Sequence, residues 1–415
     1  MEPTEAPEDP AGPFALSETG GPCSDRSRPL NVLGSIFHID ERYEIVDIVG
    51  SGAYGIVVSA RDKRTGEMVA IKKIEKAFDH PTFTKRTLRE LKILRLAQHE
   101  NIIAVKTLQL PRSRSTLSEI YVISELMQTD LSSIIRSPQL LSDEHCQFFA
   151  YQIMRGLKYL HSANIMHRDL KPRNLLVNSN CDLKICDFGL ARVDLPNLQV
   201  RAANMTDYVA TRWYRAPEVL LTSKCYTKAI DVWSVGCILG ELLVRMPIMP
   251  GTNAQNQLDL IFNLIGTPTA EDIESITNLK AKEKALRVPR RSSAFDSRFA
   301  GCNPEAVDLL KQMLIFDPNK RITVDMALNH PYFAQLHFPE DEPTTESVSY
   351  FDFLFEREVL SMEELKDKIY EEILLYHFPQ KKEEYERHKH MSPLFLPTPT
   401  LQADSHNSSE EDELI

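Results

Sequence analysis

The chain has 415 residues, which is long enough for two domains or for one unit with two lobes and flanking tails. Hydrophobic residues make up 42% and charged residues 26%, and no run approaches the roughly eighteen apolar residues of a membrane span, so we expect a soluble globular protein. The net charge of -11 lies mostly at the ends, because residues 1–35 and 381–415 each carry -4. The remaining core, at -3, has no charge excess that would indicate nucleic-acid or membrane binding.

The two ends of the chain have the composition of disordered tails. Residues 1–35 are rich in Pro, Glu, Ser and Gly, and residues 381–415 form an acidic tail. The first five residues lack the basic and apolar regions of a secretory signal. The seven cysteines form no C-x-x-C pair, which favours free thiols in a reducing compartment.

Short β-branched runs begin at Tyr43 and predict strands over residues 43–49, 56–58 and 68–72, joined as antiparallel hairpins. A G-x-G-x-x-G-x-V pattern lies between the first two strands, at residues 50–57. In a dinucleotide-binding unit such a pattern opens a helix, whereas here a strand follows it. The context therefore favours a loop whose backbone N–H groups cover phosphates.

Helical periodicity dominates the rest of the chain. Leucines at helical spacing predict a helix over residues 85–96, and a buried strand follows at 120–123. Ser142 can cap a helix that leads to His167. Residues 231–244 are apolar on nearly all sides, which predicts a helix at the centre of a large lobe.

Four motifs follow one another between residues 167 and 218: H-R-D-L-K-P-R-N, D-F-G, T-D-Y and A-P-E. Asp169 in the first motif offers a carboxylate to a hydroxyl proton. Asn174 and Asp187 offer the hard oxygen ligands that Mg²⁺ prefers. In this order and spacing, the motifs resemble those of the protein kinases, and the resemblance covers roughly residues 36–380.

The resemblance implies an α+β fold with two lobes. A small lobe of antiparallel strands with one helix is expected at residues 36–124, a hinge at 125–127 and a mainly helical lobe at 128–335. A docking segment and a C-terminal helix that folds back on the small lobe are expected at residues 336–380.

By the same resemblance, the activity is phosphoryl transfer from ATP with Mg²⁺. Lys72, held by Glu90, would anchor the phosphates, Asp169 would orient the acceptor hydroxyl, and Lys171 would reach the γ-phosphate as in serine/threonine kinases. Alone, Lys72 would be an ordinary strand lysine and Glu90 a solvated helical acid. The remaining positions implied to contact ATP are Ile48, Val49, Gly50, Ser51, Gly52, Ala53, Tyr54, Gly55, Ile56, Val57, Ala70, Ser124, Glu125, Met127 and Asp130. Ser124 is smaller than the residue usual at the back of that pocket.

Three further features resemble the mitogen-activated protein kinases. Residues 253–295 resemble their helical insert, and Thr206-Asp207-Tyr208 occupies their dual-phosphorylation site. Phosphates there would pair with arginines. The expected partners are Arg89, Arg168 and Arg192 for Thr206, and Arg212 and Arg215 for Tyr208. Asp341 and Glu342 resemble an acidic docking site in which Phe338 replaces a usual acid.

The resemblance also implies a cellular context. We expect a monomer in the cytoplasm and nucleus that is activated by a dual-specificity kinase and that binds protein substrates and phosphatases through the docking site. Two alternatives remain open. A pseudokinase is disfavoured because Lys72, Asp169 and Asp187 are all present. A cyclin-dependent kinase is disfavoured by the helix sequence ending in Glu90 and by the T-D-Y loop.

Overall fold

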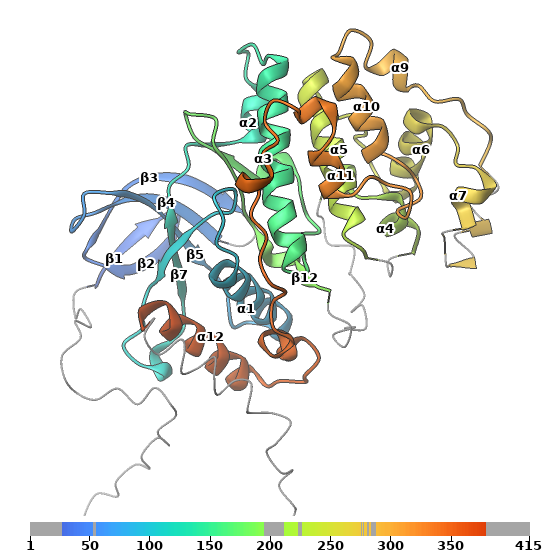
Figure 1. Ribbon diagram of the computed structural model, residues 1–415. Helices are drawn as coiled ribbons and strands as arrows, with labels where there is room; N and C mark the ends of the chain where they lie inside the picture. The colour runs from blue at the N-terminus through green and yellow to red at the C-terminus, as the bar shows by residue number, and fades with distance from the viewer. Residues whose placement is uncertain are drawn as a thin grey trace, which may run out of the picture. The chain divides into compact units, whose positions relative to one another are not determined.

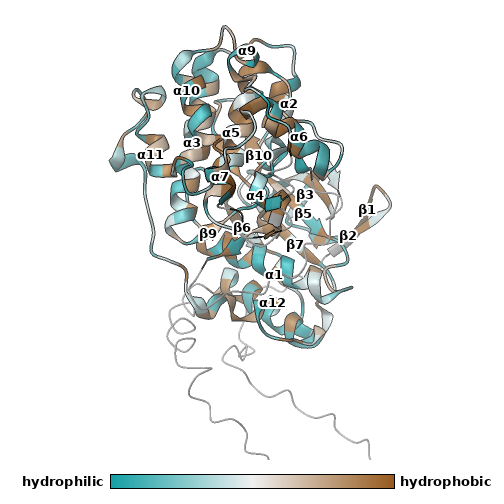
Figure 2. Ribbon diagram, turned by 90° about the vertical axis from the view of Figure 1, so that its right-hand side faces the viewer, coloured by the Kyte–Doolittle hydropathy of each residue, from teal (hydrophilic) through white to brown (hydrophobic). Residues whose placement is uncertain are grey.

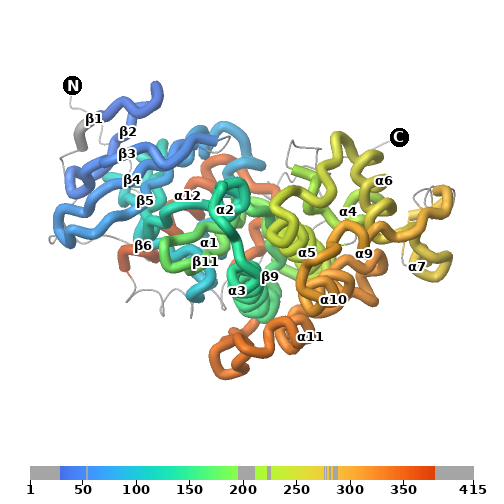
Figure 3. Tube along the Cα trace, turned by 90° about the horizontal axis from the view of Figure 1, so that it is seen from above, coloured from blue at the N-terminus to red at the C-terminus, as the bar shows by residue number. Residues whose placement is uncertain are grey.

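The computed structural model describes residues 27–52, 55–194, 211–222, 226–274, 276, 278–279, 282–283 and 288–378. Residues 21–377 belong to one compact unit. In this unit a β-sheet lobe lies beside a larger helical lobe, as Figures 1 and 3 show from two directions. The α+β class expected from the sequence is therefore confirmed. Within the described ranges, no helix is both long and apolar enough to cross a membrane.

The small lobe is built on a five-stranded sheet of order β3-β4-β5-β7-β6, in which every neighbouring pair is antiparallel. Its side chains alternate between the two faces, so residues such as Val58 and Ile71 are fully buried on one side. The strands expected from β-branched runs are present, and each is longer than expected. They are β3 (Tyr43–Gly52), β4 (Gly55–Asp62), β5 (Met68–Ile74) and β7 (Ile120–Glu125), whereas the edge strand β6 (Val105–Leu108) was not expected from the sequence.

A hairpin precedes the sheet and corrects one expectation. Strands β1 (Ser27–Val32) and β2 (Ser35–Asp40) pair with each other, so residues 27–35 do not belong to a disordered tail. Phe37 and Ile39 are buried in the core of the small lobe. The Tyr121 hydroxyl accepts a hydrogen bond from the His38 N–H at 2.9 Å. Burial of these alternating side chains stabilises a hairpin that its polar, Pro-containing sequence concealed.

The large lobe is organised around helix α5, whose side chains are buried over most of its length. Trp233 on this helix is fully buried and belongs to the main hydrophobic core. Figure 2 shows α5 among the other helices of the large lobe, with hydrophobic stretches in brown. A helix that is apolar on nearly all sides needs such a surrounding, as the sequence indicated. The longer helices of the described chain are α1 (Pro81–Leu96), α3 (Asp143–Ser162), α5 (Ala229–Val244), α6 (Ala254–Ile265), α10 (Pro304–Met313) and α12 (Met362–His377).

Shorter elements complete the large lobe. The short helices are α2 (Leu131–Arg136), α4 (Pro217–Thr222), α7 (Ala270–Glu274), α9 (Phe295–Arg298) and α11 (Val324–Leu328). Two small sheets have the orders β11-β10-β8 and β12-β9. Their strands are β8 (Thr129–Asp130), β9 (Ile165–Met166), β10 (Leu175–Val177), β11 (Leu183–Ile185) and β12 (Arg192–Val193). Strand β7 ends at Glu125, the first residue of the expected hinge, and the expected insert at residues 253–295 contains α6 and α7.

Helix α12 returns to the small lobe and packs against α1 (Figure 1). The carboxylate of Glu372 on α12 is fully buried and binds two cations of α1. Lys92 Nζ lies 3.1 Å from it, and the Arg95 guanidinium forms a second, shorter contact. Although burial opposes its charge, these two cations lower the pKa of Glu372. The contact between the chain's end and the small lobe is thus ionic at its centre.

Replacing Glu372 with Gln should lower the free energy of unfolding by about 3 kcal/mol, because buried cations lose part of their compensation. Denaturant unfolding measures this change. The control is Glu363→Gln on the same helix, where the carboxylate is 68% exposed and pairs with Arg114 at 3.1 Å. Such an exposed pair contributes about 1 kcal/mol or less. Equal losses in the two variants would contradict an ionic centre at Glu372.

Candidate active site

The loop that contains His167, Arg168 and Asp169 is held from below by Asp231, a buried residue in the first turn of α5. The Asp231 carboxylate accepts hydrogen bonds from the backbone N–H groups of His167 at 2.9 Å and Arg168 at 2.8 Å. The His161 Nε2–H donates a third, at 2.9 Å. Burial works against its charge, but these donors keep the pKa of Asp231 below its usual value.

These bonds support a strained backbone. Arg168 has a φ of 69°, in the left-handed region that non-glycine residues rarely adopt. Such a conformation persists only where its surroundings enforce it, and the two N–H bonds to Asp231 are that enforcement. The turn brings the side chain of Asp169 to the surface of the large lobe that faces the pocket described below.

Two side chains with expected roles in the reaction, Lys171 and Asn174, contact Asp169. Lys171 Nζ lies 2.5 Å from Asp169 Oδ2. Asn174 Nδ2 donates to the backbone oxygen of Asp169 at 2.9 Å and to its carboxylate at 3.3 Å. Because the amide nitrogen is used in these bonds, the amide oxygen of Asn174 is the atom that can bind a cation.

The D-F-G segment is anchored beneath the same loop. The His167 Nε2–H donates to the Cys186 carbonyl at 3.0 Å, and the rings of His167 and Phe188 are 5.0 Å apart, centroid to centroid. Phe188 is fully buried. Asp187 lies in the left-handed region, with φ 66° and ψ 71°, a second strained position held by packing on both sides.

The charged pair expected between the sheet and α1 is present. Lys72 Nζ on β5 lies 2.7 Å from Glu90 Oε1 on α1. Burial alone would lower the pKa of Lys72, but the carboxylates of Glu90 and Asp187 raise it above its ordinary value. The ammonium group therefore stays charged. It lies where the carboxylates of Glu90 on α1 and Asp187 of the D-F-G segment both act on it.

The glycine-rich stretch forms the hairpin between β3 and β4, as expected of a loop followed by a strand. Gly55 has a φ of 127°, and a Cβ atom there would lie 1.8 Å from the carbonyl oxygen of Lys73. Only glycine fits this position. Of the other expected positions in the loop, Ile48, Val49, Gly50, Ser51, Gly52, Ile56 and Val57 belong to the hairpin strands, while Ala53 and Tyr54 lie outside the described residues.

The remaining positions expected to contact ATP lie along the edge where the two lobes meet. Ala70 pairs with Ser124 across β5 and β7. The Glu125 carboxylate accepts from the Ala104 N–H at 2.8 Å and lies 3.0 Å from Lys184 Nζ. Met127 is buried. Asp130 caps α2 by accepting from the Ser133 N–H at 2.9 Å, a role that the sequence did not reveal.

Three arginines expected to pair with a phosphate lie within range of one another's charge. Arg89 donates to the Gly189 carbonyl at 2.9 Å and pairs with Glu356. Arg168 lies over the ring of Tyr226, 4.0 Å from its centroid. Burial, together with the charges of Arg89, Arg168 and Arg86, lowers the pKa of Arg192 to about 9. Thr206 and Tyr208 lie outside the described residues.

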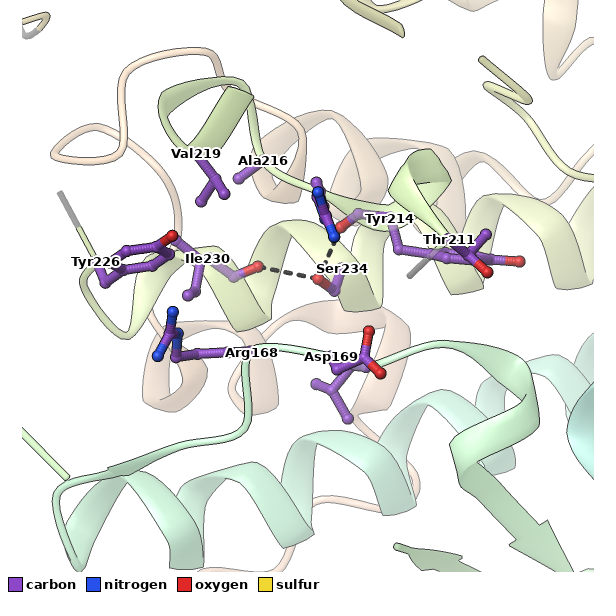
Figure 4. Close-up of a pocket in the computed structure, with 11 residues that line it drawn as sticks. Arg168, Asp169, Thr211, Tyr214, Ala216, Val219, Tyr226, Ile230 and Ser234 are labelled. Carbon is purple, nitrogen blue, oxygen red and sulfur yellow. Dashed lines mark hydrogen bonds between the residues drawn. The ribbon is translucent and has the colours of Figure 1, made fainter. Parts of the chain in front are cut away.

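A pocket lies between Asp169 and the segment that leads into α4 (Figure 4). Arg168, Arg215, Ala216 and Val219 are among the residues that line it. Its floor is fixed by the Ser234 hydroxyl, which donates to the Tyr214 carbonyl at 2.8 Å. Arg212 is directed elsewhere and donates to the Thr252 carbonyl at 3.3 Å. Arg215, but not Arg212, thus lines the pocket beside Asp169.

The A-P-E segment is braced by a buried pair. Arg321 donates to both carboxylate oxygens of Glu218, at 2.8 and 3.0 Å. The same guanidinium lies 5.0 Å from the ring centroid of Trp233 on α5. Because both oxygens of the carboxylate are bound, the pair fixes the orientation of the two side chains as well as stabilising them. It links α4 to the core of the large lobe.

The acidic docking segment differs from expectation. The Glu342 carboxylate is buried and accepts from the Tyr151 hydroxyl at 3.1 Å, Lys158 Nζ at 3.0 Å and His337 Nδ1 at 2.7 Å. It stabilises the segment and is not offered to a partner. Asp341 is exposed, and Phe338 is 55% exposed beside it. The exposed part of the expected site is therefore Asp341 with Phe338.

The donors present suit Mg²⁺ brought in with a nucleotide. No group of three or more His, Cys, Asp or Glu residues in the described part of the chain could hold a metal by itself. Mg²⁺ usually needs only one or two protein oxygens when phosphates supply others. The Asp187 carboxylate and the Asn174 amide oxygen fit that requirement.

Replacing Asp231 with Asn should speed hydrogen exchange at the backbone N–H groups of His167 and Arg168, because an amide provides one acceptor oxygen in place of two. Exchange measured by mass spectrometry on peptides that span residues 165–170 tests this. The matched control is Ser234→Ala, which removes a buried bond one turn further along α5 without touching the loop. Unchanged exchange in the Asn variant would show that other contacts hold the loop.

Residues 43–333 match the protein kinase domain family. The chain is 53% identical over 347 residues to "Extracellular signal-regulated kinase 1" of Dictyostelium discoideum, covering 83% of this chain and 65% of that protein. It is 52% identical over 341 residues to "Mitogen-activated protein kinase mpkB" of Aspergillus fumigatus, with 81% and 96% covered. Identity to "Mitogen-activated protein kinase 3" of Arabidopsis thaliana is 52% over 346 residues, with 83% and 92% covered. The chain therefore belongs to the protein kinase family and, within it, to the mitogen-activated protein kinases, which phosphorylate serine and threonine.

Proposed function

We propose that this kinase phosphorylates Ser or Thr residues that precede proline in protein substrates, and that phosphorylation of Thr206 and Tyr208 activates it. The observation that carries the proposal is the meeting of Lys171 and Asn174 at the Asp169 carboxylate, opposite a charged Lys72–Glu90 pair. Protein kinases transfer the γ-phosphoryl group of ATP, and this arrangement supplies position and charge for that step.

Each residue has one task in the proposed reaction. Asp169 accepts a hydrogen bond from the substrate hydroxyl and orients its oxygen toward the γ-phosphorus. Lys171, 2.5 Å from that carboxylate, places its positive charge where the transferred group passes. Lys72 binds the α- and β-phosphates while Glu90 fixes its position. Mg²⁺ bound by Asn174 and Asp187 would neutralise phosphate charge as the bond to the leaving group breaks.

The regulatory part of the proposal rests on the buried arginines. Burial, followed by repulsion from Arg89, Arg168 and Arg86, lowers the pKa of Arg192, so this region favours an added anion. A phosphate carries close to two negative charges at neutral pH and pairs well with guanidinium groups. Phospho-Thr206 is the anion we propose for Arg89, Arg168 and Arg192, and Arg215 would receive phospho-Tyr208. Arg89 would have to give up one of its bonds to Glu356 or Gly189 to bind this phosphate. Arg212 has the Thr252 carbonyl as its partner and would have to move to take part.

The pocket beside Asp169 supports the choice of substrate. Ala216 and Val219 give it an apolar wall that suits the proline ring after the acceptor residue. Proline has no N–H, so it leaves no donor unpaired on entering such a wall. We propose that exposed Asp341 and Phe338 dock substrates, phosphatases and an upstream dual-specificity kinase. The proposed setting is a monomer in the cytoplasm and nucleus.

Asp169→Asn should lower kcat for peptide phosphorylation by about 10²- to 10⁴-fold, because the amide cannot act as the base. Nucleotide affinity, measured by calorimetry with ADP, should stay within twofold. The control is Asp182→Asn, an exposed carboxylate on the turn between β10 and β11 that pairs with Asn178. A kcat within threefold of the wild type would remove Asp169 from the mechanism.

Thr206→Ala should abolish activation by an upstream dual-specificity kinase. In addition, the activated wild type should phosphorylate Ser-Pro peptides at least about tenfold faster than matched Ser-Ala peptides. Initial rates on the peptide pair measure both effects, with phosphate incorporation at Tyr208 followed by mass spectrometry. Full activation of the Ala variant would refute the switch. Equal rates on the two peptides would refute the proline requirement and leave the switch standing.

A further inference from the structure

We propose that Glu356, which ends the 3-10 helix Tyr350–Glu356 of the C-terminal segment, is a positioning residue for phosphoryl transfer. It acts by holding Arg89 of α1 against the backbone of the D-F-G segment. The inference rests on the proposed reaction, because it assigns Glu356 a role in placing Asp187 and Glu90 for that reaction.

Arg89 makes two kinds of contact at once. One Nη–H donates to the Gly189 carbonyl at 2.9 Å, while Nε and the other Nη bind the two carboxylate oxygens of Glu356, the latter at 2.8 Å. A guanidinium held by a carboxylate in this two-pronged way cannot rotate without breaking both bonds. Glu356 therefore sets the direction in which Arg89 reaches Gly189.

The contact lies in the interior. The side chains of Arg89 and Glu356 are 3% and 6% exposed. Burial opposes the charge of Glu356, but Arg89, followed by Arg192 and Lys85, keeps the pKa of this carboxyl below its ordinary value. The carboxylate is thus charged in a region that Arg86, Arg89, Arg168 and Arg192 make strongly positive. Without it, Arg89 would be repelled from this region and from Gly189.

The other contacts described between the C-terminal segment and α1 join these two elements to each other. Glu372 binds Lys92 and Arg95, and Lys85 donates to the Glu358 carbonyl at 2.6 Å. These bonds fasten the helix. Of the ion pairs described between the segment and α1, the Glu356 pair alone involves a side chain that also bonds to Gly189.

Glu90 and Arg89 are neighbours on α1, so a shift of one moves the other. Glu90 faces Lys72, and its neighbour Arg89 faces Gly189, two residues after Asp187. Arg86 Nε also reaches the Gly189 carbonyl, at 3.4 Å, so the shorter Arg89 bond is the main bond of the two. Together with the Lys72–Glu90 pair, it holds α1 relative to both the sheet and the D-F-G segment. Weakening the Glu356 bond should let the segment shift, which would misplace Asp187 while leaving the Lys72–Glu90 pair and the fold in place.

The test compares Glu356→Gln with Glu358→Gln in the full-length chain. Glu358 is two residues away and exposed, and its side chain carries the same charge. Before any activating phosphorylation, kcat should fall about tenfold in the first variant, stay unchanged in the second, and the KM for peptide should be equal in both. Backbone exchange at residues 187–192, measured without nucleotide, should quicken only in Glu356→Gln.

Arg89→Gln and the double variant complete the test. If Glu356 acts through Arg89, the double variant should be no slower than Arg89→Gln alone. Additive losses would overturn the inference, as would unchanged kcat and exchange in Glu356→Gln. A rise in basal kcat would also overturn it, because Glu356 would then restrain the kinase.

The two proposals fail in different ways. If the wild type transfers no phosphate to peptide even after activation, the proposed function is wrong. The exchange measurement still decides whether Glu356 holds the D-F-G segment, because it needs no turnover.

Discussion

Helix α1 makes two polar contacts at the same time, one with the sheet and one with the D-F-G segment, and the active site depends on both. Toward the sheet it presents Glu90 to Lys72 at 2.7 Å, and toward the large lobe it presents Arg89 to Gly189 at 2.9 Å. On its outer side, Lys92 and Arg95 bind a buried carboxylate of α12. A displacement of one helical turn is about 5.4 Å, which would break all of these bonds together. The position of one helix thus controls the geometry of several catalytic groups.

Several charged side chains are buried around α1, and burying them without partners of opposite charge would be unfavourable. Several guanidinium groups share a space in which the pKa of Arg192 falls to about 9. The carboxylates that offset them come from far along the chain, from the segment that follows the large lobe. The small lobe is therefore incomplete without residues that lie more than 250 positions away from α1 in the sequence. Such a layout links the C-terminal segment to the helix that carries Glu90.

The docking segment illustrates how burial changes the meaning of a sequence. Adjacent acids at Asp341 and Glu342 look equivalent, yet one faces solvent and the other is enclosed by Tyr151, Lys158 and His337. The enclosed carboxylate stabilises the turn that presents Asp341 and Phe338. With Glu342 enclosed, the turn exposes the acids Glu340 and Asp341 together with the apolar ring of Phe338.

The sequence by itself determined the α+β class, the four strands β3, β4, β5 and β7, the helices α1, α3 and α5, and the residues that gather around Asp169. These features follow from local periodicity and from motifs whose members are close in the chain, such as Asp169, Lys171 and Asn174. Only the tertiary structure decided the hairpin at residues 27–40, the burial of Glu342, the capping role of Asp130 and the grip of Glu356 on Arg89. Each of these depends on which distant surface covers a side chain, and burial and pairing between distant residues leave no periodic signal in the sequence.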